Sequence, residues 1–250
     1  MSARKLEEMI HALAAAEKNI RTVMEKTLEE RDIASKIDHT LLKPDTTSEK
    51  IKILCSEAIE YGFAAVCIPP YFVFQAKNLL AETRVKLATV IGFPLGYSHS
   101  LIKVEEAKRA MADGADELDV VMNFAAFFSG NDKEVLKEIQ SITQLANLKS
   151  KTVKWIIETG ILSDENIKRA CNLAVKAEVD YVKTSTGFTG QGATVEIVEL
   201  LRYLLPQKIK IKASGGISTR KQALELIHAG ADRIGTSSAL QIIGSEIASV

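Results

Sequence analysis

A lysine within a short apolar stretch is the first residue of this sequence with clear chemical potential. Lys183 follows Tyr181 and Val182, and a polar segment that ends at Gly187 comes directly after it. Burial within a strand disfavours the charged form of a lysine and lowers its pKa. A neutral amine held in place is a nucleophile toward an aldehyde or ketone carbonyl, with which it forms a Schiff base. The alternative is an exposed lysine on an edge strand, so the residues of the other strands must decide.

Ionisable residues also lie inside three other apolar stretches. Asp119, Lys154 and Lys212 each occupy an interior position of one of them. Alternation along a strand predicts that these side chains point toward the same axis as Lys183. A second ammonium group nearby would lower the pKa of Lys183, while Asp119 would supply the counter-charge and transfer protons. A buried ion-pair network without chemistry is the alternative, but such pairs are weak stabilisers.

Small residues follow three apolar stretches in a pattern typical of anion sites. Gly187, the pair Gly215-Gly216 and the pair Ser237-Ser238 each come directly after such a stretch. Glycine lets backbone N–H groups approach a phosphate closely, and the start of a following helix adds positive potential. Barrels commonly bind phosphate in the loops after strands seven and eight. The sequence therefore predicts a phosphate site at these five residues.

Apolar stretches alternate with segments of helical periodicity from residue 37 onward. The starts of the stretches lie 22 to 36 residues apart, about the length of one βα unit. We expect strands at 37–41, 64–68, 86–93, 117–123, 153–159, 181–186, 209–214 and 233–236. We expect helices at 48–61, 101–113, 133–147, 164–177, 194–204 and 219–229.

Eight βα units without a linker predict one closed parallel barrel of the α/β class, a (β/α)8 TIM barrel. An open doubly wound sheet is the alternative, but no G-x-G-x-x-G follows the first strand. Residues 1–32 precede this pattern and carry apolar residues at three- and four-residue steps. We expect an extra N-terminal amphipathic helix over 1–32, which covers the barrel or contacts another subunit, and a catalytic barrel over 33–250.

The composition restricts the class of partner. The 250 residues are 46% hydrophobic and 26% charged, and 32 basic residues balance 32 acidic ones. This balance gives no overall field that would recruit nucleic acid or a membrane surface. No secretory signal or run of roughly 20 apolar residues is present, which favours a cytoplasmic location. The three cysteines lack metal-ligand or paired spacing, as expected of reduced thiols.

In its motifs the sequence resembles the deoxyribose-phosphate aldolase family. The segments that carry the resemblance span roughly residues 35–240, in the family's order. They are I-D-H-T-L-L-K-P at 37–44, V-C-I-P at 66–69, V-I-G-F-P at 90–94, G-A-D-E-L-D-V at 114–120, I-E-T-G at 157–160, V-K-T-S-T-G-F at 182–188, K-A-S-G-G-I at 212–217 and G-T-S-S at 235–238. The segments that begin at 182 and 212 are highly specific at this separation.

The resemblance implies a class I aldolase that needs no metal or cofactor. Such an enzyme reversibly cleaves 2-deoxy-D-ribose 5-phosphate into D-glyceraldehyde 3-phosphate and acetaldehyde. It implies that Lys183 is the Schiff-base nucleophile and that Asp119 and Lys212 donate and accept protons. The phosphate-binding positions match Gly187, Gly215, Gly216, Ser237 and Ser238.

Five further residues are expected to support this site: Asp38, Thr40, Cys67, Glu158 and Thr186. We expect Asp38 to pair with a lysine of the barrel, and Glu158 to pair with Lys154 or Lys183. Cys67 is expected to be a small buried apolar residue.

One residue departs from the family's pattern. Some members carry a lysine directly after S-T-G that helps to hold phosphate, and Phe188 stands there in this chain. The expected partners are a sugar phosphate and further copies of the chain, in a dimer or tetramer. A Schiff-base aldolase for another sugar phosphate remains an alternative, as does a phosphate-ligand sensor or scaffold on an inactive barrel.

Overall fold

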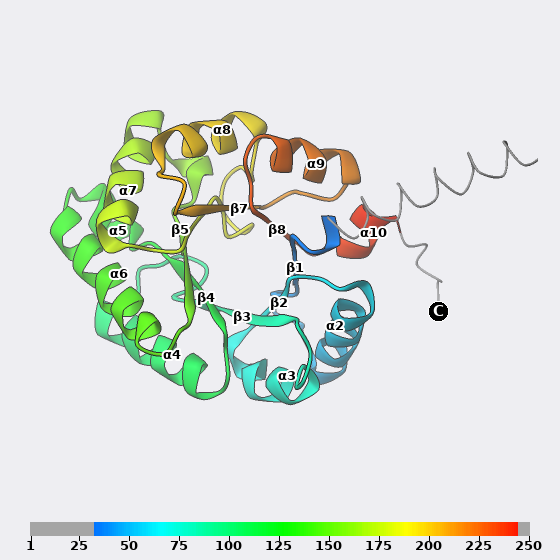
Figure 1. Cartoon of the computed structure of the whole chain (residues 1–250). Helices are drawn as coiled ribbons and strands as arrows, with labels where there is room; N and C mark the ends of the chain where they lie inside the picture. Colours follow the sequence, from blue (N-terminus) through cyan, green and yellow to red (C-terminus); the bar gives the residue numbers. More distant parts are fainter. Residues whose placement is uncertain (1–32, 245–250) are drawn as a thin grey trace, which may run out of the picture.

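Eight parallel strands close into a ring in chain order, and helices surround the ring (Figure 1). This computed structural model describes residues 33–244. The strands are β1 (Ile37–Thr40), β2 (Ala65–Ile68), β3 (Lys86–Ile91), β4 (Glu117–Val121), β5 (Thr152–Ile156), β6 (Tyr181–Lys183), β7 (Lys210–Ser214) and β8 (Arg233–Thr236). The pairing of β1 with β8 closes the ring, so the predicted (β/α)8 TIM barrel is confirmed.

Helices follow the strands in the order expected of βα units. They are α2 (Ser48–Tyr61), α3 (Val73–Leu79), α4 (Ser100–Ala112), α5 (Phe124–Phe128), α6 (Asp132–Asn147), α7 (Asp164–Ala177), α8 (Val195–Leu204), α9 (Arg220–His228) and α10 (Ala239–Ile243). Side-chain caps fix several of their first residues, because an oxygen accepts from an otherwise unpaired amide. Thr47 caps α2, Ser163 caps α7, and Thr219 forms a capping box with Gln222 at α9.

Five strands, β1 and β3 to β6, end earlier than the sequence predicted, and the difference is largest at β5 and β6. β5 ends at Ile156 and β6 ends at Lys183, three residues before the expected ends of both stretches. Glu158 adopts a left-handed backbone conformation with φ of 53°, which breaks the extended run after β5. The polar residues after Lys183 make side-chain hydrogen bonds in place of a regular ladder. The short helices α3, α5 and α10 are additions to the predicted set.

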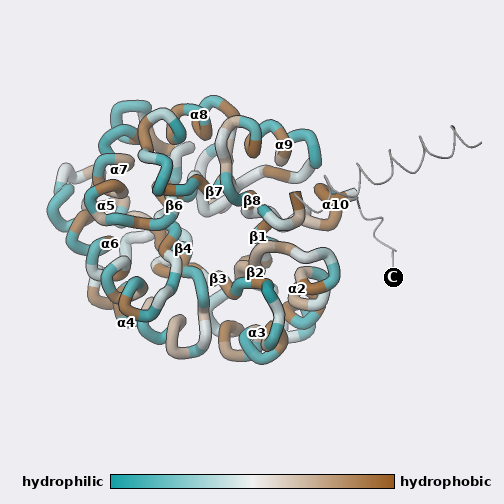
Figure 2. Tube along the Cα trace, viewed as in Figure 1, coloured by the Kyte–Doolittle hydropathy of each residue, from teal (hydrophilic) through white to brown (hydrophobic). Residues whose placement is uncertain are grey.

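The two faces of the strands differ in chemical character. Side chains that point outward are large and apolar, and they pack under the helices around the buried Trp155. Figure 2 shows apolar residues concentrated along the strands and on helix faces that turn toward them. Inside the barrel, a second apolar cluster at β2 and β3 consists of small residues: Ala65, Cys67, Ala88 and Val90. Much of the remaining interior is polar and charged.

The register of the strands brings the charged residues to matched heights. Asp119 of β4 pairs with Lys154 of β5, and Lys183 of β6 pairs with Lys212 of β7. Neighbouring residues in a parallel register point to the same face of the sheet. Closure of the ring therefore directs all four side chains to one interior region.

The predicted N-terminal helix at 1–32 lies outside the described residues, so the proposed division of the chain stays a prediction. Within residues 33–244, no helix combines the length and apolarity needed to cross a membrane.

A buried ion pair joins two of the outer helices to the end of β4. The ammonium of Lys103 in α4 lies 2.7 Å from Oε1 of Glu138 in α6. It also donates to the carbonyl oxygen of Val121 at 2.9 Å, and Ser100 donates to the other oxygen of Glu138. Because both charges are buried, loss of one partner leaves the other charge buried, with neither a counter-ion nor water to stabilise it.

We predict that Lys103→Met destabilises the fold by about 3 kcal/mol, because Glu138 stays buried without a cation. Urea unfolding followed by circular dichroism measures this change. The double variant Lys103→Met/Glu138→Leu should regain a large part of the loss, and Lys108→Met on the exposed side of α4 should change stability by less than about 0.5 kcal/mol. An equal loss in the single and double variants would contradict this account of the pair.

Candidate active site

One carboxylate in the barrel accepts hydrogen bonds from three lysines. Oδ2 of Asp119 accepts from Lys183 Nζ at 2.8 Å and from Lys212 Nζ at 2.7 Å. Oδ1 of the same residue accepts from Lys154 Nζ at 3.0 Å. All four side chains are buried. The three residues that the sequence assigned to the chemistry are therefore in direct contact, with Lys154 as a third lysine.

Two more carboxylates extend this cluster toward the N-terminal ends of the strands. Asp38 contacts Lys212 at 2.5 Å and also pairs with Arg233. This is the pairing with a barrel lysine that we expected for Asp38. Glu117 pairs with Lys154 and lies 3.2 Å from Arg233. We call these seven residues, Asp38, Glu117, Asp119, Lys154, Lys183, Lys212 and Arg233, the barrel ion cluster.

The charges of the barrel ion cluster balance only if one basic group is neutral. The cluster holds four basic groups and three carboxylates, so full ionisation leaves one excess positive charge. An uncompensated charge in a buried site is costly. Release of one proton by a lysine makes the count three against three.

Among the three lysines of the barrel ion cluster, Lys183 is the one whose pKa is lowered, which favours proton release. Burial lowers the pKa of Lys183, and the positive charge of Lys212 lowers it further, against the opposing effect of Asp119. Burial opposes the charged form of Lys212 as well, but Asp119 and Asp38 together raise the pKa of that residue. Burial would raise the pKa of Asp119, yet the surrounding lysines hold it well below its usual range. The neutral form is therefore most accessible at Lys183.

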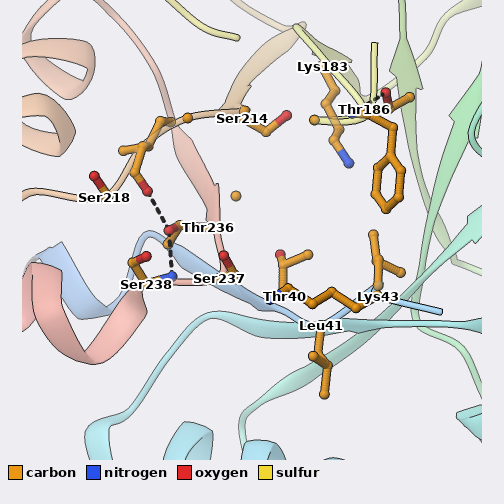
Figure 3. Close-up of a pocket in the computed structure, with 17 residues that line it drawn as sticks. Thr40, Leu41, Lys43, Lys183, Thr186, Ser214, Ser218, Thr236, Ser237 and Ser238 are labelled. Carbon is orange, nitrogen blue, oxygen red and sulfur yellow. Dashed lines mark hydrogen bonds between the residues drawn. The ribbon is translucent and has the colours of Figure 1, made fainter. Parts of the chain in front are cut away.

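A cavity of about 530 Å³ opens above the Lys183 amine at the C-terminal ends of the strands. Figure 3 shows Lys183 and Ser214 on one side of this cavity, with Thr40 and Lys43 across from them. The five predicted phosphate residues all line it: Gly187, Gly215, Gly216, Ser237 and Ser238. Thr40 and Thr186 line it too, whereas Asp119 and Lys212 are absent from its wall. Lys183 thus connects the barrel ion cluster to the cavity.

The backbone amides at the cavity differ in their availability. The N–H of Gly187 donates to Ser185 Oγ, and the N–H of Ser238 donates to Thr236 Oγ1, each at 2.9 Å. Within the described part of the chain, the amides of Gly215, Gly216 and Ser237 have no hydrogen-bond partner. Gly215 and Gly216 have φ of 92° and 72°, a region that suits glycine. These three amides are available to an anion.

Glu158 stabilises the loop after β6 and does not pair with a lysine, so that expectation is wrong. Its Oε1 accepts from the Ser185 hydroxyl at 2.5 Å. Its Oε2 accepts from the amide and the hydroxyl of Thr186, at 3.0 and 2.5 Å. The early end of β5 turns this carboxylate toward the loop, where three donors replace the expected ion pair. Glu158 therefore fixes the wall that carries Thr186 and Gly187.

Cys67 is buried beside the barrel ion cluster. Its Sγ lies 3.8 Å from Oδ2 of Asp119. Burial, together with the charge of Asp119, raises the pKa of the thiol to about 11. Cys67 is thus a neutral small residue, in line with its expected packing role.

The sequence prediction omitted three residues that the structure adds to this region. Glu117 and Arg233 belong to the barrel ion cluster, and Lys43 lines the cavity. Glu117 precedes Asp119 by two positions, so strict strand alternation would have placed it inside the barrel. Lys43 lies in a loop, where alternation gives no signal. Among residues 33–244 we find no group of three histidines, cysteines or carboxylates arranged to hold a metal ion.

Comparison with known proteins identifies the family of this chain. A family model described as DeoC/LacD family aldolase matches residues 33–243. A deoxyribose-phosphate aldolase of Caldicellulosiruptor saccharolyticus is 50% identical over 217 residues, 86% of this chain and 99% of the relative. The enzyme of the same name from Thermococcus gammatolerans is 51% identical over 85% of this chain and 95% of its own.

Solved structures agree with the sequence comparison. The tetrameric deoxyribose phosphate aldolase from Aeropyrum pernix superposes with a TM-score of 0.81 and 36% identity, over 90% of this chain and 97% of its own. The residues that the family model matches include the barrel strands that supply Lys183, Asp119 and Lys212. This chain is therefore a member of the DeoC/LacD aldolase family.

Proposed function

We propose that this protein reversibly cleaves 2-deoxy-D-ribose 5-phosphate to D-glyceraldehyde 3-phosphate and acetaldehyde, with Lys183 as the Schiff-base nucleophile. The observation that carries the proposal is the shared oxygen of Asp119, which lies 2.8 Å from Lys183 Nζ and 2.7 Å from Lys212 Nζ. This arrangement holds one amine beside a second cation and directly below a cavity. The names of the relatives support the choice of substrate.

The reaction begins at the open-chain aldehyde of the sugar. The neutral amine of Lys183 attacks C1 and forms a carbinolamine, which loses water to give a protonated imine. Asp119 and Lys212 supply and remove the protons of this step. The two residues are in contact, and Asp119 also contacts the amine of Lys183. The three groups titrate as a unit, so no proton belongs to one of them alone.

Cleavage of the carbon chain follows from the charge on the imine. The cationic imine accepts the electron pair of the C2–C3 bond as the C3 hydroxyl loses its proton to Asp119, directly or through a water. D-Glyceraldehyde 3-phosphate leaves, and an enamine stays on Lys183. Protonation of the enamine carbon and hydrolysis of the resulting imine release acetaldehyde and restore the amine.

The glycine-rich side of the cavity suits the phosphate of the substrate. The amides of Gly215, Gly216 and Ser237 face no other partner in the described residues and can donate to phosphate oxygens. Ser238 adds a hydroxyl to the same wall, whereas the hydroxyl of Thr186 donates to Glu158. Phosphate held there places C1 of the sugar near the Lys183 amine, which is the positioning that such a reaction requires.

We also propose that the chain forms a homo-oligomer. The Aeropyrum pernix relative is tetrameric, which supports this assignment. Exposed apolar side chains on the surface are consistent with it, among them Tyr71, Phe74, Leu101 and Ile102.

Borohydride trapping tests the nucleophile and the substrate class together. We predict that reduction in the presence of acetaldehyde attaches a two-carbon group to Lys183, because borohydride reduces the imine to a stable amine. Peptide mass spectrometry identifies the modified lysine. Lys183→Met should lose the adduct and at least about 10³-fold in kcat on 2-deoxy-D-ribose 5-phosphate. An adduct on another lysine, or none, would overturn the assignment.

The pH dependence of kcat/KM tests the role of Lys212. The amine of Lys183 must be neutral to attack, so the rate rises with pH through the pKa of that residue. Lys212 lowers the pKa of Lys183, so Lys212→Met should move the rising limb to higher pH. Circular dichroism must show a folded variant. A rising limb at the same pH would contradict the electrostatic role, whatever the loss in rate.

A further inference from the structure

The cavity wall holds very little charge for a site that must accept a phosphate. Of the described residues that line it, two are lysines and none is an aspartate or glutamate. One of the two, Lys183, is buried, contacts Asp119 and carries a lowered pKa. The amides of Gly215, Gly216 and Ser237 provide dipoles but no full charge. Lys43 is therefore the one permanent cation on the described wall.

Lys43 is held at its backbone, and its ammonium makes no hydrogen bond or ion pair with the described residues. Its carbonyl oxygen accepts from the amide of Thr46 at 3.1 Å and from the hydroxyl of Thr46 at 2.6 Å. The amide of Leu41, two residues earlier, donates to Cys67 at the end of β2. These bonds fix the backbone of the loop after β1, and with it the position from which the Lys43 side chain extends.

The nearest acidic residue in the loop is already paired. Lys50 Nζ contacts the carboxylate of Asp45 at 2.7 Å and also donates to the carbonyl oxygen of that residue. Within the described chain no hydrogen bond or ion pair engages the ammonium of Lys43, and the residue is exposed. A lysine whose backbone is fixed beside a cavity, and whose ammonium has no ion-pair partner among the described residues, is well placed to bind an anion.

The opposite rim contributes no charge. Phe188 follows Gly187 and packs edge-on against Phe93, with ring centroids 5.1 Å apart. Its side chain is half exposed and forms an apolar cover at the mouth of the cavity. The loop after β6 thus contributes no side-chain cation to the cavity, so any such cation must come from another strand end. Figure 3 places Lys43 across the cavity from Lys183 and Thr186.

We propose that Lys43 supplies the side-chain cation that binds the phosphate group of the substrate and selects phosphorylated over unphosphorylated sugars. This inference rests on the proposed aldolase function and adds a specificity-determining residue to the same site. The loops after β7 and β8 hold the phosphate through backbone amides, and Lys43 reaches it from the loop after β1. Because β1 pairs with β8, the loop after β1 and the loop after β8 are neighbours at the C-terminal rim of the barrel.

Steady-state kinetics of Lys43→Met on two substrates tests this proposal. With 2-deoxy-D-ribose 5-phosphate, KM should rise roughly five- to tenfold, because one charge-assisted contact is lost, while kcat changes less than about twofold. With unphosphorylated 2-deoxy-D-ribose, the loss in kcat/KM should be at least fivefold smaller than with the phosphate ester. Lys43→Arg keeps the charge and should retain the preference for the ester.

Inorganic phosphate provides a second measurement on the same variants. Its competitive inhibition constant should rise by a similar factor in Lys43→Met, because the ion occupies the same wall. Lys86→Met is the matched control, since Lys86 is an exposed lysine at the first residue of β3, at the other end of the barrel. This control should leave both measurements within about twofold of the parent.

The outcomes separate this inference from the proposed function. An equal loss on both sugars in Lys43→Met, or a loss no larger than in Lys86→Met, would overturn the role of Lys43 while the aldolase stands. An unmodified protein that cleaves neither sugar would remove the aldolase itself.

Discussion

The chemistry of this barrel depends on one oxygen atom that two ammonium groups share. Oδ2 of Asp119 lies within hydrogen-bond distance of both Lys183 and Lys212. A single carboxylate oxygen cannot fully compensate two buried positive charges, so one amine gives up its proton more readily. Asp38 contacts Lys212 and not Lys183. This second carboxylate favours the charged form of Lys212, so Lys183 is the amine that releases its proton more readily. Within the described structure, Lys183 has no second carboxylate beside it, which supports our proposal that it is the reactive amine.

Closure of the sheet makes this arrangement possible. Asp119 and Lys212 are 93 residues apart in the chain, yet the closed ring brings their side chains within 2.7 Å. The small residues of β2 and β3 leave room on one side of the interior, and the long charged side chains of β4 to β8 fill the other. Helices packed on the outer faces supply the apolar burial that an interior of charges does not provide. The fold therefore tolerates a polar centre because its hydrophobic core lies outside the ring.

Much of this could be predicted from strand alternation. The period-two pattern placed Asp119, Lys154 and Lys212 on the axis, and the barrel followed from the spacing of the βα units. Positions beyond the strand ends could not be predicted in this way. Glu158 leaves the extended conformation at φ of 53°, so its carboxylate turns to the loop after β6 instead of a lysine. Lys43 lies in a loop, where no strand or helix period predicts the direction of a side chain. Its loop lies beside β8 only because the sheet closes into a ring.

Charge is divided between two depths of the site. The barrel ion cluster is largely buried, and at low effective dielectric its fixed charges determine which group carries a proton. The wall above the cluster offers amides, hydroxyls and one exposed lysine. A dianion can bind there without displacing a carboxylate, because none of the described residues that line the wall is an aspartate or glutamate. If the cations of the wall were buried beside Lys183, they would lower the pKa of that amine further and also repel the imine that it forms. In the proposed mechanism, an exposed Lys43 on the wall therefore leaves the pKa of the buried Lys183 to the groups of the barrel ion cluster.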